Sequence, residues 1–274
     1  MGTMVQDIHS QTFRRGSKTY YNSTRFFPAA VRHDVYMLYA FVRTADNFVD
    51  NRPQDAAGFD AFEQAYRHAL SGTPAGDPII DGFIELAQRR EFDPAWTDAF
   101  FASMRSDLGD GRRTKLEQSI EYMYGSAEVI GLFMARITEL PREADHAARM
   151  LGRAMQYINF LRDIAEDNEL GRIYLPIEES ELESLSFAEA RAKSQQFATF
   201  VRAQLERFYA WQAEAEAGYR FIPRRYRVPI KTAADMYKWT GRQIARDPFV
   251  VFQRKVKPGR GRIVACGLAN WVTA

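Results

Sequence analysis

The chain has little cysteine and histidine. Cys266 is the single cysteine, and only four of the 274 residues are histidines. One cysteine excludes an intrachain disulfide framework, and so few thiol and imidazole groups indicate no zinc-type metal site. Net charge is also small, since 37 basic and 35 acidic residues leave a formal +2. This balance indicates no nucleic-acid partner, so any ligand site has to be sought locally.

Long hydrophobic runs are missing too. No segment approaches the roughly 18 apolar residues of a transmembrane helix, and "MGTMVQDIHSQTFRRGSK" lacks the apolar core of a signal peptide. We therefore expect a cytoplasmic protein. The tail "IVACGLANWVTA" is apolar but short and is interrupted by Gly267. We expect it to pack on the core, with an interfacial membrane foot as the alternative.

Strand signals are scarce, whereas helical periodicity recurs in most windows between Pro28 and Ala245. The sequence therefore predicts an all-α fold. No break is long or biased enough to be an interdomain linker, so we expect one domain over residues 1–274, with about 16 flexible N-terminal residues. The predicted helices cover residues 28–50, 56–71, 78–90, 94–107, 115–138, 142–169, 187–219 and 230–246.

The stretch "YAFVRTADNFVDN" places like charges one turn apart in an apolar helix, which opposes helix formation by a few tenths of a kcal/mol. At about 100° per residue, Tyr39, Arg43, Asp46 and Asp50 fall on one stripe. Because apolar residues cover much of the remaining circumference, we expect the stripe to face an internal cavity. A solvated acidic face is the alternative.

A second stripe runs through "QYINFLRDIAEDNELGRIYLP". Gln156, Asn159, Asp163 and Asp167 share a sector of about 80°, whereas Arg162 and Glu166 flank it at i and i+4, a spacing at which they can pair with each other. Carboxylates in two i, i+4 pairs without nearby His or Cys suit hard cations such as Mg²⁺, which takes one or two carboxylates together with water and phosphate oxygens. The sequence therefore predicts a magnesium site.

Basic and hydroxyl groups could supply the other half of a diphosphate site, because Arg and Lys bind phosphate oxygens well. These groups lie in three further segments: Ser17, Lys18 and Thr19; Arg172 and Tyr174; and Arg254 and Lys255.

Together these segments resemble the squalene and phytoene synthase family, the all-α prenyltransferases that join two prenyl diphosphates head to head. "RTADNFVD" is similar to its first aspartate-rich motif and "QYINFLRDIAEDNELGRIYLP" to its second. "SKTYYNSTRFFP" resembles its N-terminal diphosphate-binding segment, and "YMYGSAEVIG" its middle segment. The resemblance covers about residues 17–257 and implies a helical bundle of the isoprenoid synthase type around a central cavity.

The resemblance also implies roles for individual residues. The implied metal ligands are Asp46, Asp50, Asn159, Asp163 and Asp167, with Mg²⁺ or alternatively Mn²⁺ as the ion. Catalysis is assigned to the four aspartates with Tyr39, Tyr122 and Arg43. Substrate binding is assigned to Ser17, Lys18, Gln156, Asn159, Arg162, Arg172, Tyr174, Tyr237 and Arg254.

Two residues depart from the family pattern. Asn47 replaces an acid of the first motif, and helical phase turns it away from the stripe. Glu128 stands among residues that are usually small. From Tyr122, phase puts Ser126, Val129 and Phe133 on one stripe and Glu128 roughly opposite, so we expect Glu128 to face outward rather than to obstruct a prenyl tunnel.

The implied reaction is a Mg²⁺-dependent 1-1′ condensation through a cyclopropylcarbinyl diphosphate. We expect two geranylgeranyl diphosphates to give phytoene without NADPH, because the chain shows no strand with a glycine-rich dinucleotide turn and lacks the C-terminal anchor of eukaryotic-type squalene synthases. A C30 enzyme that makes squalene, presqualene diphosphate or dehydrosqualene from farnesyl diphosphate is the alternative. A terpene cyclase and a non-catalytic lipid-binding or assembly factor are the further rivals. Since the product is insoluble in water, we expect peripheral membrane contact; oligomeric state is not predicted.

Overall fold

The computed structural model describes residues 8–11, 24, 27–109 and 111–273. Within these ranges the chain forms helices and no β-strand, which confirms the predicted all-α class; an isolated bridge joins Arg112 to Ile173. The α-helices are α3 (Ala29–Asp50), α4 (Ala56–Leu70), α5 (Pro78–Arg89), α6 (Pro94–Ser106), α7 (Leu116–Met123), α8 (Val129–Ile137), α9 (Asp145–Arg162), α10 (Ile164–Glu169), α11 (Phe187–Ala192), α12 (Ser194–Glu216), α13 (Arg224–Arg246), α14 (Val250–Gln253) and α15 (Arg260–Thr273). Short helices are η1 (Tyr124–Glu128, a π-helix) and the 3₁₀ turns η2 (Arg142–Ala144), η3 (Ile177–Glu179) and η4 (Ala217–Phe221).

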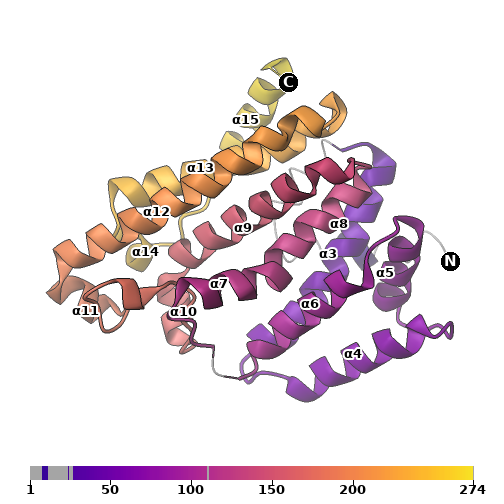
Figure 1. Ribbon diagram of the computed structural model, residues 1–274, viewed down its shortest axis with the longest axis horizontal. Helices are drawn as coiled ribbons and strands as arrows, with labels where there is room; N and C mark the ends of the chain where they lie inside the picture. Colours follow the sequence, from indigo (N-terminus) through magenta and orange to yellow (C-terminus); the bar gives the residue numbers. More distant parts are fainter. Residues whose placement is uncertain (1–7, 12–23, 25–26, 110, 274) are drawn as a thin grey trace.

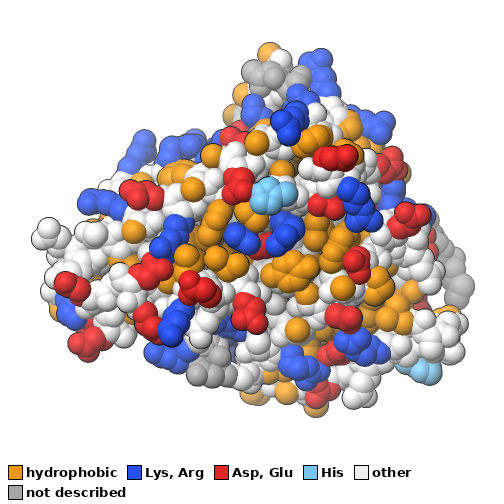
Figure 2. All heavy atoms as spheres, viewed as in Figure 1, with side chains coloured by type: hydrophobic (Ala, Val, Ile, Leu, Met, Phe, Trp, Pro, Cys, Tyr) orange, Lys and Arg blue, Asp and Glu red, His pale blue; other side chains and the backbone are white. Residues whose placement is uncertain are grey.

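The helices form a bundle in which α9 packs between α8 and α12 and also contacts α13 (Figure 1). On the other side α3 packs against α4, α5, α6 and α8. Figure 2 shows basic and acidic side chains interspersed with apolar ones on the face seen in this view. The two helices that carry the predicted carboxylate stripes, α3 and α9, therefore lie in the interior of the arrangement.

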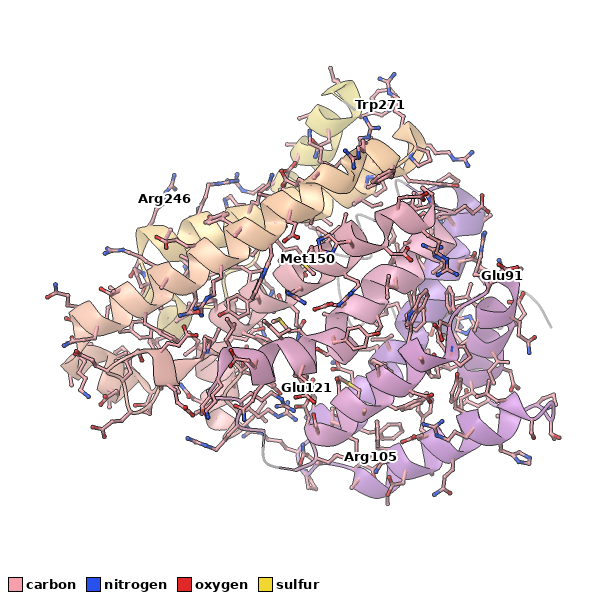
Figure 3. All side chains as sticks on the ribbon, viewed as in Figure 1. Glu91, Arg105, Glu121, Met150, Arg246 and Trp271 are labelled. Carbon is pink, nitrogen blue, oxygen red and sulfur yellow. The ribbon has the colours of Figure 1, made fainter. Side chains whose placement is uncertain are left out.

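Four predicted helices differ from the observed ones. The helix predicted over 115–138 is divided into α7 and α8 by the π-helix η1. The helix predicted over 142–169 is interrupted at Asp163, whose φ of −102° and ψ of 14° depart from helical values. The one predicted over 187–219 is interrupted at Lys193, and the one predicted from 230 begins earlier, at Arg224, with Pro229 inside it. The tail forms α15, which packs along α13 and carries Trp271 near its free end (Figure 3). None of the described helices is long and apolar enough to cross a membrane.

Aspartate–proline pairs start two helices on the α3 side. The Asp77 carboxylate accepts a hydrogen bond from the Ile79 amide at 2.7 Å, and the Asp93 carboxylate accepts one from the Ala95 amide at 2.9 Å. Each acid satisfies an amide that the helix cannot, and the following proline fits the first helical position. These caps fix where α5 and α6 begin to cover α3.

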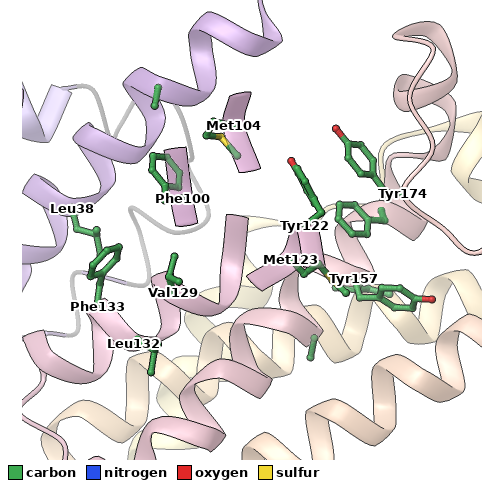
Figure 4. Packing of buried hydrophobic residues seen from close by; sticks show 14 of the residues in the cluster. Leu38, Phe100, Met104, Tyr122, Met123, Val129, Leu132, Phe133, Tyr157 and Tyr174 are labelled. Atoms are coloured by element: carbon green, nitrogen blue, oxygen red, sulfur yellow. The ribbon is translucent and has the colours of Figure 1, made fainter. Parts of the chain in front are cut away.

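Aromatic side chains fill the core between α3, α5, α6 and α8. Phe41 stacks on Phe83 with 3.8 Å between ring centroids, and Phe133 meets Phe83 edge-on at 5.9 Å. Figure 4 shows Phe133, Leu38 and Phe100 among the residues of this cluster. A Cβ at Gly131 would lie 2.1 Å from the Ala148 carbonyl, so the absence of a side chain lets α8 and α9 approach closely. The core therefore fixes α3, α8 and α9 relative to one another.

Candidate active site

A cavity of about 930 Å³ lies between α3, α9, α10 and α13. Both predicted stripes line it, so the structure brings together side chains that are more than a hundred residues apart in sequence. The stripes therefore face a cavity, as expected, although the Asp50 side chain at the end of α3 is also 41% exposed. The predicted residues that line the cavity are Tyr39, Arg43, Asp46, Asp50, Tyr122, Gln156, Asn159, Arg162, Asp163, Asp167, Arg172, Tyr174 and Tyr237.

Three predicted residues are not among those lining the cavity. Ser17 and Lys18 lie outside the described residues, as does the N-terminal segment that we expect to be flexible. Arg254 is exposed and does not line the cavity, whereas Lys255 and Lys257 do. Arg254 has an extended backbone, with φ of −163° and ψ of 152°.

Arginines neutralise the carboxylates of α3. Arg43 donates to Asp46 at 2.5 Å from one turn earlier in the same helix. Asp50 accepts a hydrogen bond at 2.8 Å from Arg172, which follows α10 and also donates to the Val49 carbonyl at 2.6 Å. Arg172 therefore ties the end of α3 to the segment that leaves the second stripe.

The carboxylates of the second stripe are paired differently from the prediction. Arg162 bonds Asp163 rather than Glu166, with 2.8 Å between Arg162 Nε and Asp163 Oδ1. Glu166 instead pairs with Lys255, whose ammonium also lies 3.5 Å from Asp163. The predicted Arg162–Glu166 pair is wrong because the interruption at Asp163 removes the i, i+4 register between the two side chains.

Burial raises the pKa values of two of these carboxyl groups, those of Asp46 and Asp167. Desolvation, with the nearby Asp50 as the next cause, raises the pKa of Asp46 to about 7. Desolvation and the neighbouring Asp163 raise the pKa of Asp167 to about 8. Each carboxylate would be stabilised by a cation placed beside it. Burial also raises the pKa of Tyr39 to about 12, so its hydroxyl stays protonated at neutral pH.

The oxygen atoms of the cavity fit a hard cation. Asn159 Oδ1 is buried without a hydrogen-bond partner, a costly arrangement that a ligand would relieve. No group of three or more His, Cys, Asp or Glu side chains in the described part of the chain is placed to hold a metal ion by itself. Carboxylate and amide oxygens without sulfur or imidazole suit Mg²⁺, which usually shares its coordination with water and phosphate. The donor set therefore fits a divalent cation that arrives with an anionic ligand.

Asp107 is a cavity residue that the sequence did not single out. Its buried carboxylate accepts hydrogen bonds from the Tyr122 hydroxyl at 2.6 Å and the Tyr174 hydroxyl at 2.9 Å. Both hydroxyls point to the same side in Figure 4. The Arg113 guanidinium lies 3.2 Å from Asp107 and 4.0 Å from the centre of the Tyr122 ring. The sequence shows only an acid directly after a helix, which is common and does not mark a site.

The expected outward orientation of Glu128 is wrong. Its side chain is fully buried and accepts hydrogen bonds from Arg149 at 2.9 Å and Arg153 at 2.6 Å, both on α9. The side of η1 opposite Tyr122 is covered by α9, so facing away from the cavity still means burial. Glu128 lines neither of the cavities described here, so it does not obstruct a tunnel.

A second, apolar cavity of about 340 Å³ adjoins the first. The two share lining residues, among them Tyr39, Ser126 and Asn159. Its walls are mostly aliphatic and small, with Ala127, Gly131 and other residues of η1, α8, α9 and α13, whereas most phenylalanines belong to the core. The site thus combines a polar cavity rich in charged groups with an apolar one.

Comparison with known proteins agrees with this geometry. Residues 13–262 match the family model described as squalene/phytoene synthase. The chain is 29% identical over 249 residues to 15-cis-phytoene synthase of Pantoea ananas, covering 84% of this chain and 79% of that protein. It is 29% identical over 269 residues to 15-cis-phytoene synthase of a Synechocystis species, with 91% and 79% covered.

Solved structures share the fold. A dehydrosqualene synthase in complex with ligand superposes with a TM-score of 0.87 at 22% identity, covering 99% of this chain and 96% of that one. A squalene synthase from Alicyclobacillus acidocaldarius superposes with a TM-score of 0.80 at 21% identity, covering 89% and 94%. The arrangement of helices is therefore that of these enzymes.

Proposed function

Because the chain belongs to the squalene/phytoene synthase family, we propose that it is a prenyltransferase that joins two prenyl diphosphates in a 1-1′ linkage. The substrate is geranylgeranyl diphosphate and the product is phytoene, for carotenoid biosynthesis. The observation that carries this proposal is the polar cavity lined by two carboxylate pairs, directly beside an apolar cavity. The phytoene synthases among the relatives support the chain length. Residues 1–274 would form one isoprenoid synthase domain.

A divalent cation, Mg²⁺ or Mn²⁺, would be held by Asp46, Asp50, Asp163 and Asp167 with Asn159. When bound, it draws charge from the diphosphate and so favours its departure. The raised pKa values of Asp46 and Asp167 support this assignment, because a bound cation would stabilise both carboxylates in their charged form. The buried Asn159 Oδ1 supports it as well, because a cation would give this atom the partner that it lacks.

The basic side chains of the cavity would bind the diphosphate oxygens. Arg43, Arg162 and Arg172 already line it and pair with carboxylates. Lys255, which the sequence offered beside Arg254, and Lys257 line it as well. Arginine and lysine donate charge-assisted hydrogen bonds to phosphate oxygens, so these residues would fix the reacting carbons near Tyr39 and Tyr122. Gln156, Tyr174, Tyr237, Ser17 and Lys18 would complete the substrate sites.

The reaction would proceed in two ionisations. In the first, the C1–O bond of one molecule breaks, diphosphate leaves, and the allylic cation is captured by the double bond of the second molecule. Loss of a proton closes the cyclopropane ring. In the second, the remaining diphosphate leaves, the cation rearranges, and loss of a proton forms the central double bond, so NADPH is not consumed. The apolar cavity would hold the prenyl chains and keep water from the cations.

The location of the protein follows from the same chemistry. Phytoene is insoluble in water, so the enzyme would be cytoplasmic with peripheral membrane contact, where its product can leave.

Product analysis tests the proposal. The purified protein is incubated with Mg²⁺ and either farnesyl or geranylgeranyl diphosphate, with and without NADPH, and extracted products are identified by mass spectrometry. We expect a C40 triene without NADPH, and none from an Asp163→Asn variant that keeps its circular dichroism spectrum. A C30 product would replace phytoene by squalene or dehydrosqualene, and a product from one diphosphate alone would indicate a terpene cyclase. No product at all would support a non-catalytic role.

A further inference from the structure

The exposed apolar side chains of this protein are concentrated on one helix. Six large hydrophobic side chains are exposed in the described part of the chain, and four of them lie on α15: Val264, Leu268, Trp271 and Val272. Trp271 and Val272 are the most exposed, at 68% and 77%. Single exposed apolar residues are normal, but a group on one element marks an interaction surface.

Helical geometry puts these side chains on one face. At about 100° per residue, Val264, Leu268 and Trp271 fall within an arc of roughly 60°. The opposite face carries Ile263 and Asn270, which are buried against α13. Asn270 donates to Asp235 at 2.9 Å, which holds the helix in this orientation. The apolar face is therefore fixed outward by specific contacts on the other side of α15.

Basic residues lie around the apolar face of α15, and α15 itself contains no acidic residue. Between Ala217 and Ala234 the chain contains no acid but has five basic residues. Within α15 there are two arginines and no acid. Figure 2 shows Lys and Arg side chains on the projection that α15 and the adjoining ends of α12 and α13 form at the top of the view, with Asp and Glu side chains at its base. The basic residues in question are Arg220, Arg224, Arg225, Arg227, Lys231, Arg260 and Arg262.

This charge is local, because the chain as a whole is nearly neutral at +2. A tryptophan with aliphatic neighbours and flanking arginines suits the interface of a bilayer whose headgroups are anionic. A purely apolar protein partner would gain nothing from the arginines. Charge complementarity therefore favours an anionic lipid surface as the occupant.

The position of the surface relative to the apolar cavity supports the same occupant. Ile222, Pro229 and Ile230 line that cavity and come from the segment that carries the basic residues. A bilayer held against α15 and the start of α13 would lie next to the hydrocarbon-binding cavity.

From these observations we propose that the outer face of α15, together with the basic residues at the start of α13, docks the protein on anionic lipid membranes. The side chains of Val264, Leu268 and Trp271 enter the interface, and Arg224 and Arg225 contact the headgroups. The docking surface itself stands on exposure and charge, whereas its use for hydrocarbon release rests on the proposed function.

Vesicle binding tests the proposal without substrate. The full chain is sedimented with vesicles of phosphatidylcholine alone or with phosphatidylglycerol, at low and high salt. We expect binding to the anionic vesicles that weakens as salt screens the headgroups, and quenching of tryptophan fluorescence by brominated lipid that a Trp271→Phe variant reduces. Val264→Ser/Leu268→Ser/Trp271→Ser should lower the partition coefficient by roughly tenfold or more. Arg224→Glu/Arg225→Glu should abolish the preference for anionic lipid.

Two control variants change exposed apolar or basic side chains that lie outside the proposed docking surface. Leu70→Ser/Phe187→Ser removes two exposed apolar side chains outside α15, and Arg202→Glu/Arg246→Glu reverses two exposed arginines. Arg246 and Trp271 lie far apart in Figure 3. Both control variants should bind like the wild type. Equal loss in a control variant, or full binding by the triple variant, would overturn the proposal.

A second copy of the chain is the competing occupant, and light scattering separates the cases. A wild-type dimer that the triple variant converts to monomer, with vesicle binding unchanged, would show that this face joins two copies. Turnover of geranylgeranyl diphosphate in detergent should be equal for wild type and triple variant. If neither turns over while vesicle binding follows the expected pattern, the proposed function fails and the docking surface stands.

Discussion

Replacing Glu128 by Gln should destabilise the protein without changing its product. The Glu128 carboxylate is fully buried and joins the end of η1 to α9 through Arg149 and Arg153. Arg153 is 15% exposed and Arg149 is 38% exposed in their side chains, so Arg149 can turn to water when the carboxylate is lost. Arg153 would keep a largely buried charge without its partner.

The expected magnitude follows from this difference in exposure. Removing one partner of a buried ion pair costs about 3 to 5 kcal/mol. Because one of the two arginines can rehydrate and the amide oxygen keeps one acceptor, we expect about 2 to 4 kcal/mol for Glu128→Gln. For a protein of this size 1 kcal/mol corresponds to roughly 2 to 3 °C, so Tm should fall by about 4 to 12 °C.

Thermal and urea unfolding measure this effect, and product analysis at 25 °C measures the function. Glu85→Gln is the matched control, because Glu85 pairs with Arg89 at the surface and is 57% exposed, so its loss should cost less than about 0.5 kcal/mol. A double-mutant cycle with Arg153→Gln should give a coupling energy above about 1 kcal/mol. An unchanged Tm would refute the buried ion pairs, and a changed product length would refute the position of Glu128 outside both cavities.

Three further outcomes follow from the polar cavity. Asp163→Asn should lower turnover by roughly a thousandfold or more and leave Tm within a few degrees, measured by product formation and calorimetry. Asp107→Asn should loosen the hydroxyls of Tyr122 and Tyr174 and lower kcat by about 10- to 100-fold with little change in KM; an equal change in both would argue for a lost binding contact instead. Without divalent cations, the free energy of unfolding should fall as pH rises from about 4 to 8. The pKa values of Asp46 (about 7) and Asp167 (about 8) are raised in the folded state, so over this range the folded state binds protons that the unfolded state releases. Calorimetry of the Asp46→Asn variant should show a weaker dependence of stability on pH.

The helical period was sufficient to predict which side chains share a face where a helix is regular. The helix α3 is uninterrupted from Ala29 to Asp50, so the stripe of Tyr39, Arg43, Asp46 and Asp50 computed from the sequence is the one that lines the cavity. The second stripe also lines the cavity, although its helix is interrupted at Asp163. Gln156 and Asn159 precede the interruption, and beyond it the Asp167 amide still donates to the Asp163 carbonyl at 2.9 Å, which keeps Asp167 one turn after Asp163.

Predictions from the sequence failed where the position of a side chain depends on how the helices pack against one another. Phase correctly turned Glu128 away from Tyr122, but a period within one helix cannot show that α9 covers the far side as well. Asp107 follows a helix and reaches the cavity only because α6 ends there, which needs three-dimensional information. Lys255 and Lys257 line the cavity and Arg254 does not, and the sequence of this segment gives no period from which that could be predicted.

The charges of the polar cavity explain why the metal and the substrate depend on each other in the proposed function. Among the described residues, six carboxyl and five basic side chains line it, so the lining is within one charge of neutrality when all are ionised. Each diphosphate adds several negative charges, and the arginines that would receive it are already paired with carboxylates. Divalent cations can take over the carboxylates and release the arginines for phosphate oxygens, so cation and diphosphate each create the site for the other. Two facing carboxylate pairs, each opposing the stability of its own helix, are then retained because together they bind the metal that makes the cavity accept an anion.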